Sequence, residues 1–84
     1  MSAFNNRIEQ GLQRLFSEER REGLHVVPAS KLLGAAICIG SGGAPYDEVR
    51  NPFVTSSREF IDFKMGWQLA ATNRKALTKM GAIV

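Results

Sequence analysis

A run of ten residues in the middle of the chain, KLLGAAICIG at 31–40, has a charged side chain only at its first position. Its apolar residues surround a helix on nearly all sides, which is the pattern of a helix buried among other elements. Its uncharged part, LLGAAICIG at 32–40, is less than half as long as the roughly 20 residues that cross a bilayer. We therefore predict a buried helix at the centre of a single domain spanning residues 1–84, with Ser30 as the N-cap residue of that helix.

An amphipathic helix is predicted to precede this run, over residues 4–23, with Gly23 closing it. Between the two helices lies LHVVP at 24–28, which we interpret as an extended connector in preference to an edge strand. The apolar residues of the first helix recur at spacings of four, four, three and one, so that they share one face; they are Phe4, Ile8, Leu12, Leu15 and Phe16.

A third helix is predicted from the stretch NPFVTSSREFIDFKMGWQLAA at 51–71. Ser56 and Glu59 have the spacing of a capping box, which places the start of the helix there. A stripe of Phe60, Phe63 and Trp67 follows at helical spacing and continues to about residue 79. The glycine- and proline-rich residues 40–55 before it predict a long loop.

Gly34 and Gly66 lie inside the second and third predicted helices. A glycine within a helix costs about 1 kcal/mol relative to alanine, and the usual compensation is room for another backbone to approach. We therefore predict an all-α domain of three helices. Its second and third helices form an antiparallel pair around Gly34, Gly66 and Trp67, and the N-terminal helix is added to that pair.

The residues that carry chemistry predict neither an enzyme nor a cofactor or metal site. His25 and Cys38 are single residues of their kinds, whereas a zinc site needs about four suitable donors. Cys38 lies in an apolar segment, where burial raises a thiol pKa, so a structural role is favoured over a nucleophilic Cys-His pair. GSGGAP at 40–45 lacks the lysine of a P-loop and follows a helix, so a linker is favoured over a phosphate cradle.

The charge of the chain permits an anionic partner. Its net charge is +3 and its pI is near 9.5. Two groups of basic residues are candidates for contacts with nucleic-acid phosphates, although cations at a helix C-terminus are also favoured by the helix dipole alone. The aromatic stripe of the third helix is interpreted as core in preference to a platform for stacked bases. The candidate phosphate-binding residues are Arg7, Arg14, Arg21, Arg74, Lys75 and Lys79.

Three motifs, LLGAAICIG, NPF and FIDFKMGWQLA, together resemble the ribosome modulation factor family, including its ciprofloxacin-resistance-protein branch and phage-encoded relatives. The resemblance covers about residues 31–72. The chain departs from the family pattern at Asn51, where a cysteine is typical, in its longer loop, in its less basic charge and in its extra N-terminal helix. The matching positions are Gly34, Gly40, Pro52, Phe53, Phe63, Gly66, Trp67 and Ala70.

This resemblance implies a two-helix unit, here at 30–80, that binds the small ribosomal subunit. We accordingly expect a cytoplasmic, non-enzymatic regulator of translation that binds the ribosome through 16S rRNA, with no membrane partner and with a homodimer as one possible state. The alternative is a phage-encoded inhibitor of a host protein complex that acts by protein-protein contact. A drug-modifying kinase activity, described for the ciprofloxacin-resistance branch, has no nucleotide-binding motif here to support it.

Overall fold

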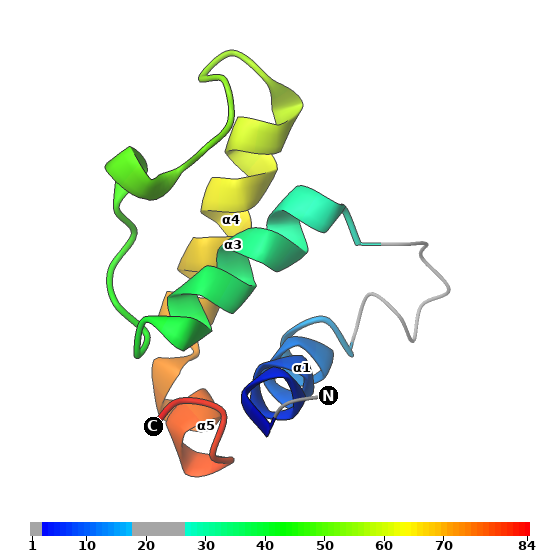
Figure 1. Cartoon of the computed structure of the whole chain (residues 1–84), viewed down its shortest axis with the longest axis vertical. Coiled ribbons are helices and arrows are strands. Elements are labelled where there is room, and N and C mark those ends of the chain that lie inside the picture. Colours follow the sequence, from blue (N-terminus) through cyan, green and yellow to red (C-terminus); the bar gives the residue numbers. More distant parts are fainter. Residues whose placement is uncertain (1–2, 18–26) are drawn as a thin grey trace.

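The computed structural model describes residues 3–17 and 27–84, and within these ranges it contains helices and no strands (Figure 1). The elements are α1 (Ala3–Leu15), α3 (Ala29–Gly40), the short 3-10 helix η1 (Glu48–Arg50), α4 (Arg58–Thr72) and α5 (Arg74–Lys79). The predicted all-α class is confirmed. Residues 18–23 of the predicted 4–23 helix, including Gly23, lie outside the described residues. Residues 24–26 of the expected connector also lie outside them.

Helices α3 and α4 pack against each other at two glycines, as predicted. A Cβ atom added to Gly34 would overlap the carbonyl oxygen of Phe63 and lie 3.1 Å from the backbone nitrogen of Trp67. A Cβ atom added to Gly66 would overlap the carbonyl oxygen of Lys31. The two backbones are therefore in direct contact, which only glycine permits at these positions.

The direction predicted for this helix pair is wrong. Both helices run from the upper to the lower part of Figure 1, so they cross in the same general sense and are not antiparallel. The ends of the two helices agree with this, because Gly43, just after α3, lies against the side chain of Arg74, just after α4. A parallel pair needs a connection long enough to return along the helices. Residues 41–57 form this connection, which we name the return loop.

The core lies where α3, α4 and their neighbours meet. Its largest fully buried side chains are Trp67, Phe63, Leu77, Phe16 and Cys38. The rings of Phe63 and Trp67 lie 5.9 Å apart, and Phe53 from the return loop contacts Phe63 edge-on at the same distance. Aromatic residues therefore join α4 to the loop that covers it.

Helix α1 packs against α3 and the C-terminal segment. At Gly11 an added Cβ would lie 3.0 Å from the side chain of Ile39 and 3.1 Å from that of Ala82. Phe16, beyond the end of α1, is 1% exposed, and Ile8, Leu12 and Leu15 pack against the core. The predicted apolar face is thus confirmed for these four residues.

Helix α3 is not buried on all sides, contrary to the prediction. Leu33 is 41% exposed, and Ala29 and Gly40 are exposed at positions one turn and two turns away on the same side. The domain is too small to surround an apolar helix completely, because few elements are available to cover it. Within the described residues, no helix is long and apolar enough to span a membrane.

The predicted starts of two helices are displaced by one or two residues. Helix α3 begins after Pro28, whose fixed φ suits a helix start, and Ser30 lies buried in the first turn without capping it. The N-cap of α4 is Ser57, whose Oγ accepts a hydrogen bond from the Phe60 amide at 3.2 Å. The predicted Ser56–Glu59 capping box is therefore wrong.

A break at Asn73 also divides the helix that was predicted to continue to residue 79. The Asn73 side chain donates to the Leu69 carbonyl at 2.8 Å, and α5 begins at the next residue. An asparagine side chain can compete with the backbone for hydrogen bonds, which favours a change of direction there. The break turns α5 toward α1.

Substitution of Gly66 by alanine tests the backbone contact. We expect Gly66→Ala to lower the free energy of unfolding by about 1–3 kcal/mol or more, because the added methyl group meets backbone atoms that cannot move aside. Gly11→Ala is the matched control. Its methyl group meets only side chains, and alanine favours a helix, so it should change stability by less than about 1 kcal/mol. Equal effects in urea denaturation would contradict the contact.

A pair of serine substitutions tests the start of α4. Ser57→Ala should lower the free energy of unfolding by about 1 kcal/mol, because it leaves the Phe60 amide without its acceptor. Ser56→Ala should have almost no effect, since Ser56 is exposed and outside the cap. Thermal unfolding of both variants measures this, and a larger loss from Ser56→Ala would place the cap one residue earlier.

Candidate nucleic-acid interface around the end of α3

The GSGG motif at 40–43 ends α3 and does not form a phosphate cradle. The amide of Ser41 donates to the Ile37 carbonyl at 2.9 Å, that of Gly42 to Ile39 at 3.1 Å, and that of Gly43 to Cys38 at 2.8 Å. Gly42 and Gly43 have φ angles of 76° and 78°, the left-handed conformation typical of a helix stop. Because these amides satisfy helix carbonyls, they are not available to an anion.

The return loop is fixed to the core by one carbonyl group. The oxygen of Ala44 accepts a hydrogen bond from the indole Nε1 of Trp67 at 2.8 Å and one from the Cys38 thiol at 3.5 Å. Tyr46 then packs edge-on against the Trp67 ring, with 5.6 Å between ring centroids. The expected flexible linker is therefore an ordered segment tied to α3 and α4.

Arg50, in η1, lies over this segment. Its Nη1 donates to the Oγ of Ser41 at 2.8 Å, and its guanidinium lies 5.1 Å from the centre of the Trp67 ring. Both contacts hold the cation in one orientation while the residue as a whole stays exposed. Arg50 was not predicted from the sequence, because neither partner is close to it in the sequence and no periodic pattern includes it.

Arg74 lies on a second side of the turn at 40–43 that ends α3. The first carbons of its side chain lie against Gly43, where an added Cβ would be 2.8 Å from Cγ, and the residue is exposed. Its positive charge is near enough to lower the pKa of Cys38, although burial has the larger effect and raises that pKa to about 11. The stem of Arg74 is packed, and its charged end faces solvent.

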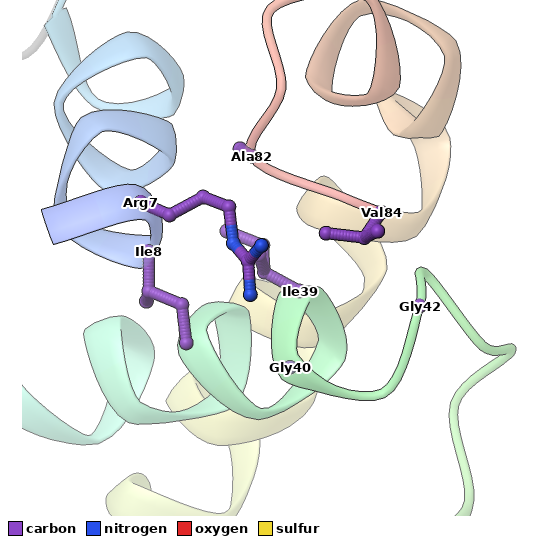
Figure 2. Close-up of a pocket in the computed structure, with 7 residues that line it drawn as sticks. All are labelled: Arg7, Ile8, Ile39, Gly40, Gly42, Ala82 and Val84. Carbon is purple, nitrogen blue, oxygen red and sulfur yellow. The ribbon is translucent and has the colours of Figure 1, made fainter. Parts of the chain in front are cut away.

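Arg7, in α1, lies on a third side of the end of α3. It lines a cavity of about 90 Å³ together with the last residues of α3 and the C-terminal segment. In Figure 2 its guanidinium extends over the last turn of α3, beside Ile39 and Gly40. The other residues of the lining are Ile8, Gly42, Ala82 and Val84.

Three arginines from separate elements therefore surround the last turn of α3: Arg7, Arg50 and Arg74. We name them the arginine cluster. The structure brings Arg7 and Arg74 together from the predicted set. Arg14, Lys75 and Lys79 are exposed on α1 and α5, and Arg21 lies outside the described residues.

The electrostatics of this region favour an anion. The only ion pair between described residues joins Arg58 and Asp62 at 3.5 Å, and none of the described cations of the predicted set takes part in one. The C-terminus of a helix carries a partial negative charge of about half an elementary charge, which stabilises the cluster but does not neutralise three cations.

The residues of the proposed structural motif lie in or beside the core. Phe63, Trp67 and Ala70 have no exposed surface, so Phe63 and Trp67 cannot stack on bases, and their interpretation as core is confirmed. Phe53 contacts Phe63, whereas Pro52 is exposed at the turn before it. No group of three His, Cys, Asp or Glu residues that could hold a metal ion occurs in the described part of the chain.

Comparisons of the chain with protein-family models, with curated proteins and with solved structures gave no match.

The Cys38 thiol predicts a specific pH dependence of stability. Burial raises its pKa from 9.0 to about 11, so the unfolded thiol loses its proton at a lower pH than the folded one. Stability should be unaffected below about pH 9 and fall between about pH 9 and 11, by up to about 3 kcal/mol. Urea denaturation at several pH values measures this.

The control for that measurement is Cys38→Ala, which removes the thiol and leaves every other titrating group in place. Its stability should fall less steeply than that of the wild type over the same alkaline range. If the free energy of unfolding falls equally steeply with pH in the two proteins, deprotonation of Cys38 on unfolding is not the cause of the loss.

Proposed function

We propose that the protein is a small non-enzymatic regulator of translation that binds the ribosome through the phosphates of 16S rRNA. The observation that carries this proposal is the arginine cluster: three cations from α1, η1 and α5 around one helix end, without carboxylate partners among the described residues. Binding of nucleic-acid backbone depends mainly on such phosphate contacts.

The cluster suits a rigid, folded RNA. Arg50 is held by Ser41 and Trp67, and Arg74 by its packing on Gly43, so both are oriented before any ligand binds. Preorganised side chains lose less entropy on binding than free ones. Guanidinium groups also bind phosphate in a bidentate manner, which a flexible lysine cannot do. Lys75 and Lys79 extend the basic surface along α5 as additional contacts.

The resemblance to the ribosome modulation factor family supports a ribosomal target over other nucleic acids. In this proposal the chain is a relative of that family, with α1 added before the two-helix unit. Gly34, Gly66 and Trp67, which match the family motif, form the crossing of α3 and α4, so the matched residues serve the fold. The basic residues then supply the binding.

A second candidate function follows from the exposed side of α3. Ala29, Leu33 and Gly40 leave an apolar strip open to solvent on a helix that carries no charge after Lys31. Exposed apolar surface of this kind is typical of protein contacts. It favours the alternative of a phage-type inhibitor that binds a host protein complex.

Sedimentation with purified bacterial ribosomes tests the leading proposal. The protein should co-sediment at low salt and dissociate as salt is raised. Arg74→Gln removes one phosphate contact, so the slope of log K against log salt should become shallower by about 0.7–1. Arg58→Gln is the matched control: it removes the same charge at the far end of α4 and should leave the slope unchanged.

Absence of co-sedimentation at low salt would overturn the ribosomal proposal, and so would equal slopes for both variants. Nuclease treatment separates the two candidate functions. A factor bound through rRNA is released when nuclease digests the RNA, whereas an inhibitor bound to a protein complex stays bound.

A further inference from the structure

Arg7 has an unsatisfied hydrogen-bond donor inside the molecule. Its Nε is fully buried and has no hydrogen-bond partner. Buried polar groups of proteins are nearly always paired, and a charged group without a partner costs more than a neutral one. Figure 2 shows the guanidinium directed into the cavity between α1, the last turn of α3 and the C-terminal segment. The cavity is therefore the place where an acceptor for the outer nitrogens of this guanidinium would lie.

The protein itself does not supply that acceptor. Apart from Arg7, the side chains on the cavity wall are aliphatic, from Ile8, Ile39, Ala82 and Val84, and the polar surface of the wall comes from Arg7 and from main-chain atoms. The carbonyls of Ile37, Cys38 and Ile39 at the end of α3 already accept hydrogen bonds from the helix stop. Arg7 also forms no ion pair with any described carboxylate. The Nε of Arg7 is thus held inside the molecule without an acceptor.

We propose that this cavity binds a phosphate group, with Arg7 as its main donor. A volume of about 90 Å³ exceeds the roughly 30 Å³ that one water occupies in the liquid, so the space admits a group larger than a single water. A guanidinium presents two parallel N–H groups to the oxygens of a phosphate, which makes the pair stronger than a single hydrogen bond. Gly40 and Gly42 line the cavity without adding side chains to it.

The phosphate has two possible sources, free phosphate and the backbone of an RNA. The second source rests on the function proposed above, in which Arg7 would hold one phosphate in the cavity while Arg50 and Arg74 contact others on the surface. The chemistry at Arg7 is the same in both cases. An experiment with inorganic phosphate and one with ribosomes therefore distinguish the sources.

The first experiment follows the Nε–H resonance of Arg7 by NMR while inorganic phosphate replaces chloride at constant ionic strength. The Arg7 resonance should shift and saturate. The Arg14 resonance should not, because Arg14 is exposed on the same helix and serves as the internal control. Arg7→Gln should abolish saturable binding of phosphate, and Arg7→Lys, which keeps the charge but loses the paired donors, should weaken it about tenfold.

No saturable shift at Arg7, or equal shifts at Arg7 and Arg14, would overturn the inference. The inference would also be overturned if the Arg7 resonance shifted as a carboxylate of the protein titrated but did not respond to phosphate. The acceptor would then belong to the protein. Because the resonance is observed in the wild-type protein, this outcome does not depend on whether a variant folds.

The second experiment measures sedimentation of Arg7→Gln and Arg58→Gln with ribosomes. If the phosphate comes from RNA, Arg7→Gln should bind ribosomes about tenfold more weakly than Arg58→Gln. If the wild type binds phosphate at Arg7 and both variants bind ribosomes equally well, the cavity binds phosphate and its ligand is free phosphate. If the wild type binds ribosomes but the Arg7 resonance does not respond to phosphate, the inference that the cavity binds phosphate is overturned. The proposed function is then retained.

Discussion

The contact between the backbones of α3 and α4 at Gly34 and Gly66 determines the rest of the structure. Side chains larger than a hydrogen atom at either position would separate the helices, because each added Cβ would overlap a carbonyl oxygen of the other helix. Close approach lets Trp67 reach past α3 to the Ala44 carbonyl and brings the ends of both helices together. The return loop and the arginine cluster are placed by that approach.

The end of α3 is a structural feature on which the proposed binding surface depends. A helix C-terminus attracts cations, and three arginines from distant parts of the chain lie around this one. The helix stop uses its amides internally, so only side chains are left to meet an anion. In the proposed function, phosphate would therefore be bound by guanidinium groups, which favour phosphate oxygens in fixed directions.

The sequence allowed prediction of the helices and of the glycine contact, because both depend on local periodicity and on the cost of a glycine within a helix. It misplaced the caps at Ser30 and Ser56, where several serines and a proline compete for the same role over a few residues. The direction of the helix pair depended on whether the long loop returns along the helices, which no local pattern decides. Arg50 was missed because its partners Ser41 and Trp67 are distant in sequence, while Arg7 and Arg74 were found through charge alone and not through their position around α3.

The shared direction of α3 and α4 has a consequence for how the chain folds. An antiparallel pair can form from its turn outward, adding contacts between residues that are already near each other. Here the whole of residues 41–57 must first come back along α3, so the entropy of closing a loop is lost before any contact between the helices is gained. Helix α1 adds to this, because Gly11 meets Ala82 from the other end of the chain. The contacts between these helices thus join residues far apart in sequence, which places the folding rate below that of a simple helical hairpin of the same length.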